Sequence, residues 1–159
     1  MKKKVIIGIG EWAVEKNPAI LVTLGLGSCV GVCIRDPVAR IGGMVHVMLP
    51  DSGGKVTSTP GKFADSGIDL VIEELLKMGG QRSRLEAKIA GGASMFQSAM
   101  DIGNRNIEAV LKSLERNSIK LLAKDVGGNK ARSIEYDIES GKLLIRKVKT
   151  GDAVEVSEI

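Results

Sequence analysis

Extended apolar runs dominate the first fifty residues of the chain. Segments 4–14 and 19–25 are rich in β-branched residues and are separated by Asn17-Pro18, so they predict two strands. Two further extended segments, 28–36 (SCVGVCIRD) and 41–49 (IGGMVHVML), flank Asp36 and Pro37, which are favoured at the first two positions of a β-turn. These two segments predict an antiparallel hairpin.

Apolar residues at helical spacing appear twice in the rest of the chain. Segments 62–78 and 104–117 each predict an amphipathic helix, and the first pattern ends at Gly79-Gly80. The apolar stripes consist of Ala64, Ile68, Val71, Ile72 and Leu75 in the first helix and Ile107, Val110, Leu111 and Leu114 in the second.

Further strands surround the second helix. Segments 84–90 (RLEAKIA) and 119–126 (IKLLAKDV) predict single strands, and 131–149 predicts a hairpin turning at Ser140-Gly141. Only part of this order alternates strand and helix, which favours an α+β fold over a doubly wound sheet. The chain has 159 residues, 43% of them hydrophobic. We therefore expect one domain over residues 1–159.

Composition and charge narrow the classes of function. Aromatic residues make up only 3% of the chain, and the net charge of +4 is dispersed, so a nucleic-acid partner is not expected. The basic start is followed by an apolar run that ends at Glu11, which is too short for a secretory signal, and no segment is long enough to insert into a membrane. We expect a cytoplasmic protein with reduced thiols.

The predicted hairpin brings the single histidine of the chain toward the first of its two cysteines. If Asp36 faces Ala39 across the turn, Cys29 lies opposite His46. A turn two residues longer makes the pair diagonal, but both side chains stay on one face unless a bulge intervenes. Small residues on that face predict a shallow trough, and the other face is predicted to be the core side: Val30, Val32, Ile34, Val45, Val47 and Leu49.

A cysteine beside a histidine suggests nucleophilic catalysis. The imidazole lowers the pKa of the thiol and later protonates the leaving group, and a third group must orient the ring. Thr23, Asp36 and Asp51 are near in sequence, and Thr23 precedes the glycine-rich turn that contains Gly27 and Ser28. Backbone N–H groups of that turn are candidate donors to an oxyanion, which makes Gly27 and Ser28 candidate substrate-binding residues.

Other roles remain open for these residues. Cysteine and a lone histidine are common core residues, and Cys33 is expected to be a packing residue in either case. A zinc site would need a further ligand beyond Cys29, Cys33 and His46, so we expect no metal and no cofactor. Ser28 is a weaker nucleophile candidate because no G-x-S-x-G elbow surrounds it.

Several motifs, in order and over nearly the whole chain, resemble the CheD family of chemoreceptor glutamine deamidases. They are TLGLGSCVGVCIRDP, GGMVHVMLP, GGASMF, IGNRN and DVGGNKARSIEYD. The resemblance implies layered β-sheets with two main helices on one side, a β/β/α sandwich. It also implies a nucleophilic Cys29 with His46 and Thr23, a substrate in the cytoplasmic region of methyl-accepting chemoreceptors, and binding of the phosphatase CheC.

Two alternatives to this function stay open. One is a non-catalytic adaptor that regulates CheC, and the other is a cysteine amide hydrolase or transamidase with another protein substrate. We also expect Met95 and Phe96, which are apolar residues in a glycine-rich segment, either to help form the substrate surface or to cap the core.

Overall fold

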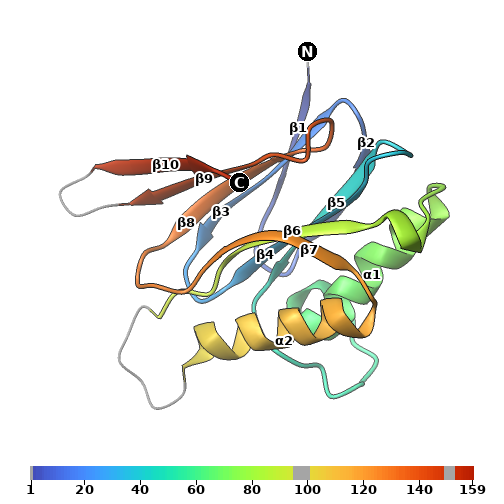
Figure 1. Ribbon diagram of the computed structural model, residues 1–159. Helices are drawn as coiled ribbons and strands as arrows, with labels where there is room; N and C mark the ends of the chain where they lie inside the picture. Colours follow the sequence, from blue (N-terminus) through green and yellow to red (C-terminus); the bar gives the residue numbers. More distant parts are fainter. Residues whose placement is uncertain (1, 95–100, 149–152) are drawn as a thin grey trace.

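The computed structural model describes residues 2–94, 101–148 and 153–159. Within them lie two five-stranded sheets and two α-helices, and Figure 1 shows the sheets stacked with the helices beneath the second one. One sheet has the order β1-β3-β8-β9-β10 and the other β2-β5-β4-β6-β7. This layering confirms the predicted α+β, β/β/α architecture.

The first sheet consists of strands from both ends of the chain. β1 (Lys3–Ile7) pairs in parallel with β3 (Ala19–Leu26), and the other pairings of this sheet are antiparallel. Its remaining strands are β8 (Arg132–Asp137), β9 (Leu143–Val148) and β10 (Val154–Glu158). The β8–β9 hairpin was predicted, whereas β10 was not.

The second sheet is the middle layer of the molecule. Its strands are β2 (Trp12–Lys16), β4 (Val30–Asp36), β5 (Ile41–Val47), β6 (Glu86–Gly91) and β7 (Lys120–Val126). The prediction of a single strand over 4–14 was wrong, because a turn at Gly8–Gly10 sends β1 and β2 into different sheets. Gly10 has a φ of 74°, a backbone conformation that glycine adopts without strain.

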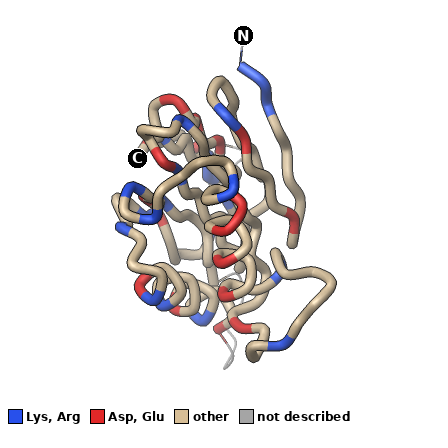
Figure 2. Tube along the Cα trace, turned by 90° about the vertical axis from the view of Figure 1, so that its right-hand side faces the viewer, with Lys and Arg blue, Asp and Glu red and all other residues tan. Residues whose placement is uncertain are grey.

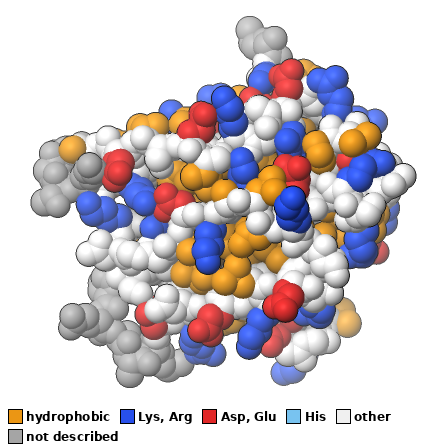
Figure 3. Space-filling model, viewed as in Figure 1, with side chains coloured by type: hydrophobic (Ala, Val, Ile, Leu, Met, Phe, Trp, Pro, Cys, Tyr) orange, Lys and Arg blue, Asp and Glu red, His pale blue; other side chains and the backbone are white. Residues whose placement is uncertain are grey.

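The helices cover one face of the middle sheet. α1 spans Ala64–Lys77 and α2 spans Ile102–Arg116, both close to the predicted ranges. The side chain of Asp101 caps α2 by accepting a hydrogen bond from the Asn104 amide. Apolar side chains reach the surface along the seam between β7 and α2 (Figure 3), where Ile107, Leu111 and Leu121 are only partly buried.

Two apolar cores result, one on each side of the middle sheet. Val30, Val32 and Val45 face the helices, as predicted, whereas Cys33 and Met44 face the first sheet. The prediction that only one face of the β4–β5 hairpin lies in the core was therefore wrong. The structure also corrects the predicted trough: a Cβ at Gly31 would lie 2.6 Å from Ile134 Cδ1, because β8 packs directly on this face.

Charged residues are spread over the whole trace rather than gathered on one face (Figure 2). Most ion pairs among the described residues join side chains near the surface, such as Lys3 with Glu15 and Arg116 with Asp69. Pairs of this kind contribute little to stability. Among the described residues, neither helix is long and apolar enough to cross a membrane.

Candidate active site at the β4–β5 hairpin

The observed hairpin has the longer of the two turns considered from the sequence. Asp36 pairs with Ile41 and Gly31 with His46, and the ladder runs without a bulge from Val30 to Asp36. Cys29 precedes β4 by one residue and is therefore diagonal to His46 rather than opposite it. Both side chains face the layer between the sheets, since Cys29 packs in that core and His46 contacts Thr23 of the first sheet.

Thr23 orients the imidazole from the first sheet. Its Oγ1 lies 2.7 Å from His46 Nδ1 and 2.8 Å from the carbonyl oxygen of Ile7. A hydroxyl has one hydrogen, and the Ile7 carbonyl can only accept, so Thr23 donates to Ile7 and accepts from Nδ1–H. The proton of the neutral ring is therefore on Nδ1, and Nε2 carries the lone pair.

The other two candidates for orienting the ring lie elsewhere. Asp36 is buried at the turn end of the hairpin, where it accepts from the Val38 and Ala39 amides and pairs with Arg84. Asp51 accepts from the Gly53 amide in the loop after β5. Of the three residues, the structure brings only Thr23 to His46.

Burial sets the protonation state of the pair. Thr23 and His46 are fully buried, and Cys29 is 8% exposed. Loss of solvation lowers the pKa of His46 to about 4 and raises the pKa of the Cys29 thiol, in contrast to the lowered thiol pKa expected from the sequence. At neutral pH the site therefore contains a thiol and a neutral imidazole. Among the described residues, His46 Nε2 has no hydrogen-bond partner, so the Cys29 thiol does not donate a hydrogen bond to it in this structure.

The segment before β4 is held by its carbonyl groups. The Gly27 carbonyl accepts from the Ala93 amide and the Cys29 carbonyl from the Gly92 amide, both at 2.8 Å, and the Ser28 carbonyl accepts from Asn106 Nδ2 at 2.9 Å. The Gly27 amide donates to the Gly25 carbonyl at 3.1 Å. Within the described part of the chain, the Ser28 and Cys29 amides have no acceptor, so they remain available to a ligand.

The segment after β6 closes around this loop. Gly91 and Gly92 have φ values of 116° and 67°, and Arg132 donates to the Gly91 carbonyl at 2.7 Å. Gly91 and Gly92 are the first two residues of the GGASMF segment. The predicted roles of Met95 and Phe96 lie outside the described residues. The site predicted from the sequence did not include Arg132 or Asn106.

Cys33 is fully buried, as expected for a packing residue, and burial raises the pKa of its thiol well above the usual range. No group of three potential metal ligands from His, Cys, Asp and Glu occurs within residues 2–94, 101–148 and 153–159.

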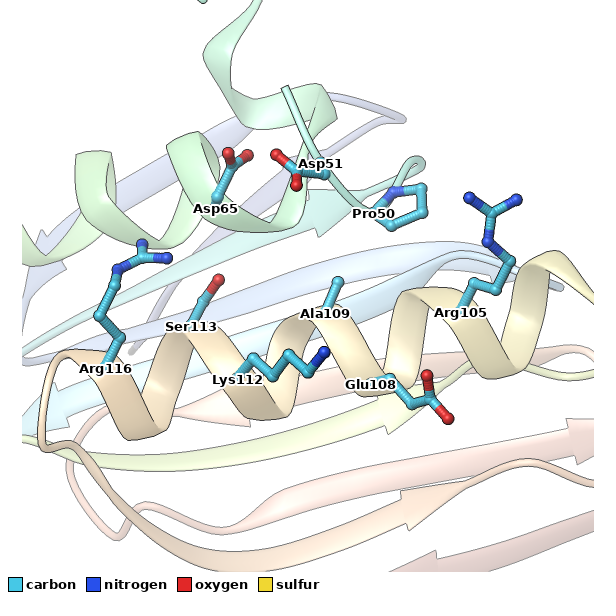
Figure 4. A pocket seen from close by; sticks show the side chains of 9 residues that line it. All are labelled: Pro50, Asp51, Asp65, Arg105, Glu108, Ala109, Lys112, Ser113 and Arg116. Carbon is cyan, nitrogen blue, oxygen red and sulfur yellow. The ribbon is translucent and has the colours of Figure 1, made fainter. Parts of the chain in front are cut away.

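The hollow drawn in Figure 4 is a separate feature. It encloses about 320 Å³ between α2 and the loop after β5, and its lining includes Asp51, Asp65, Arg105, Lys112 and Arg116. Acidic and basic side chains thus face each other across it. Because it includes neither Cys29 nor His46, it is not the site of thiol chemistry.

Comparison with known proteins identifies the family. The family model described as CheD chemotactic sensory transduction matches residues 48–147. A Thermotoga maritima protein named chemoreceptor glutamine deamidase CheD is 65% identical over 160 residues, and the alignment covers 100% of both chains. This chain belongs to the CheD family.

Other CheD relatives are more distant but also match over most of their length. A Desulfitobacterium hafniense protein named probable chemoreceptor glutamine deamidase CheD is 42% identical over 97% of this chain and 99% of its own. The crystal structure of Neisseria meningitidis protein NMB0706 shares the fold, with a TM-score of 0.51 and 8% identity, over 80% of this chain and 65% of that one. The family model begins after His46, whereas the alignment with the Thermotoga relative covers the whole chain and so extends over Thr23, Cys29 and His46.

The glycine at position 91 is predicted to be essential to this CheD site. A Cβ there would lie 2.3 Å from the Cys29 carbonyl oxygen, and the φ of 116° is unfavourable for alanine. We expect Gly91→Ala to lower the free energy of unfolding by about 2–3 kcal/mol and the deamidation rate by about 100-fold. Chemical denaturation and a rate assay on the folded protein measure the two effects.

Gly54→Ala is the matched control. Gly54 also has a positive φ, 72°, but a Cβ there meets nothing within 4 Å. Gly54→Ala should lower the free energy of unfolding by about 1 kcal/mol and leave the deamidation rate unchanged. Equal rates for Gly91→Ala and Gly54→Ala would contradict the role given to Gly91.

Proposed function

We propose that this protein is a cytoplasmic chemoreceptor glutamine deamidase that acts as one domain and converts selected receptor glutamines to glutamate through a thioester on Cys29. One observation carries the chemistry: the hydrogen bond from His46 Nδ1 to Thr23 leaves the Nε2 lone pair free, on the side of the sheet where Cys29 packs. The name and full-length similarity of the Thermotoga relative support the substrate.

The first half of the reaction forms the thioester. The Cys29 sulfur attacks the side-chain carbonyl carbon of glutamine while its proton passes to His46 Nε2. The Ser28 and Cys29 amides, which have no acceptor among the described residues, donate to the oxyanion. His46 then returns the proton to the amide nitrogen, the C–N bond breaks, and ammonia leaves.

The second half returns the enzyme to its starting state. Nε2 takes a proton from water, the resulting hydroxide attacks the thioester carbon, and the proton passes to the departing sulfur. This half of the reaction yields glutamate and the free Cys29 thiol, and water is the only co-reactant that it consumes. Thr23 and the Ile7 carbonyl stabilise the transient imidazolium through the Nδ1–H hydrogen bond.

Cys29 and His46 are both neutral before the reaction begins. Because burial raises the pKa of Cys29 and lowers that of His46, no thiolate–imidazolium pair is present before substrate arrives. Proton transfer from Cys29 to His46 is therefore expected only once substrate is bound. A glutamine amide that covers the site brings the dipole needed to stabilise the forming charges.

The test uses a chemoreceptor cytoplasmic fragment from the same genome. We expect the wild-type protein to release ammonia and to raise the mass of particular glutamine-containing peptides, as replacement of nitrogen by oxygen requires. Receptor glutamines left intact by folded protein would contradict the proposal. Added primary amines distinguish a deamidase from a transamidase, because a transamidase would attach the amine to glutamine whereas a deamidase leaves glutamate.

We further propose a CheC-type phosphatase as a binding partner. Membership of the CheD family supports this partner. In this proposal CheC binds the same face of the molecule as the receptor substrate. Deamidation of the receptor fragment should then slow as CheC is added, with receptor concentration restoring the rate. A CheC that binds without changing the rate would place its contact elsewhere.

A further inference from the structure

Asn106 links the chain on both sides of the reactive pair. Its side chain is fully buried on α2, and Nδ2 donates to the Ser28 carbonyl at 2.9 Å and to the Met48 carbonyl at 3.0 Å. Ser28 directly precedes Cys29, and Met48 lies two residues after His46. One amide group thus holds the segments that carry the nucleophile and the base.

The orientation of this amide follows from its partners. Both are carbonyl oxygens, which only accept, so the NH₂ group and not Oδ1 must face them. Oδ1 is buried without a partner among the described residues, an arrangement that costs free energy. A side chain that served only to fill space would not need this cost, because the apolar residues Val110 and Leu114 already pack α2 against the sheet.

The Ser28 carbonyl controls the direction of the next amide. In a trans peptide the C=O and the following N–H point in opposite directions. A hydrogen bond that holds the Ser28 carbonyl toward α2 therefore turns the Cys29 N–H away from the helix. That N–H has no acceptor within the described residues, and it is one of the two donors available to an oxyanion.

We propose that Asn106 is a positioning residue, which fixes the Ser28–Cys29 peptide so that the Cys29 amide is held ready for the oxyanion and ties this peptide to the segment after His46. The proposal rests on the proposed deamidase function for its effect on rate. Asn106 itself does not touch the substrate. It acts through the backbone that it holds.

The rate experiment compares the wild type with Asn106→Ala and Asn106→Leu. Leucine keeps the approximate size of the side chain, introduces no buried charge and cannot donate a hydrogen bond, so it serves if the alanine variant fails to fold. We expect kcat for a receptor fragment to fall about 10- to 100-fold in both variants, less than the loss of a whole oxyanion donor, while KM changes less than about threefold.

A second readout does not depend on activity. In protein labelled with [15N]cysteine, the two amide signals report Cys29 and Cys33 separately. The heteronuclear NOE of Cys29 should fall in both Asn106 variants as its peptide gains freedom, and that of Cys33, in the middle of β4, should not change. If the wild type proves inactive, the deamidase proposal fails while this comparison still tests the role of Asn106.

Leu114→Ala is the matched control on the same helix. Leu114 is 2% exposed and packs against the middle sheet, so this variant should lose stability but keep kcat and the Cys29 signal of the wild type. The proposal is overturned if the Cys29 amide of the Asn106 variants is as rigid as in the wild type. It is also overturned if Leu114→Ala lowers kcat and the Cys29 NOE as much as Asn106→Ala does.

Discussion

Replacing Cys29 with alanine should abolish deamidation while leaving the fold intact. The sulfur forms the thioester, so its loss should lower the rate by about 10⁴-fold or more. Cys29 precedes β4 and is slightly exposed, and the free energy of unfolding should change by only about 1 kcal/mol. Peptide mass spectrometry of the receptor fragment and chemical denaturation measure the two quantities.

Cys33→Ala provides the comparison within the same strand. Its thiol is fully buried against the first sheet, so alanine there should cost about 1–2 kcal/mol of stability and keep the rate of the wild type per folded molecule. Deamidation that survives in Cys29→Ala, or is lost only in Cys33→Ala, would rule out Cys29 as the nucleophile. A Cys29→Ala variant that still binds CheC but no longer deamidates the receptor would show that catalysis is distinct from an adaptor role.

His46→Gln should have the next largest effect. Glutamine has a similar length but no basic nitrogen, so the thiol proton has no acceptor, and we expect kcat to fall about 10³-fold. Steady-state kinetics with the receptor fragment measure the change, and the melting temperature verifies folding. Met44→Leu, on the same face of β5 and also fully buried, should keep its activity. A folded His46→Gln enzyme within threefold of the wild type would contradict the base role.

Local patterns were sufficient for much of the fold. The apolar stripes predicted α1 and α2 closely because one face of each packs on the middle sheet. The hairpin could be predicted from Asp36-Pro37, but the length of its turn could not. The structure has the longer turn, with Arg40 at a φ of 60°. Because the two turns differ by two residues and side chains alternate between the faces of a sheet, Cys29 and His46 lie on one face with either turn.

What sequence reasoning missed depends on contacts between distant segments. The small residues on the Cys29 face of the hairpin predicted a shallow trough, and only the position of β8 reveals that Ile134 fills the space beside Gly31. Similarly, the strand β10 has a short sequence with exposed valines, which local reasoning did not pick out. Pairing with β9 makes it a strand.

The supporting residues of the site were missed for the same reason. Asn106 and Ser28 are 78 positions apart, and Arg132 and Gly91 are 41 apart. One signal was present for Asn106: it lies four residues before Val110 on the buried side of α2, where a polar side chain needs a partner. The identity of that partner could come only from the fold.

The most direct test of the central claim is the protonation state of His46, the single histidine of the chain. NMR of protein labelled with [15N]histidine distinguishes a protonated ring nitrogen from one with a lone pair. We predict a neutral ring at pH 7, protonated on Nδ1 and bare on Nε2, that becomes charged only near pH 4. A ring protonated on Nε2, or one that titrates near pH 6.5, would contradict the account, because the thiol of Cys29 would then lack the buried base described here.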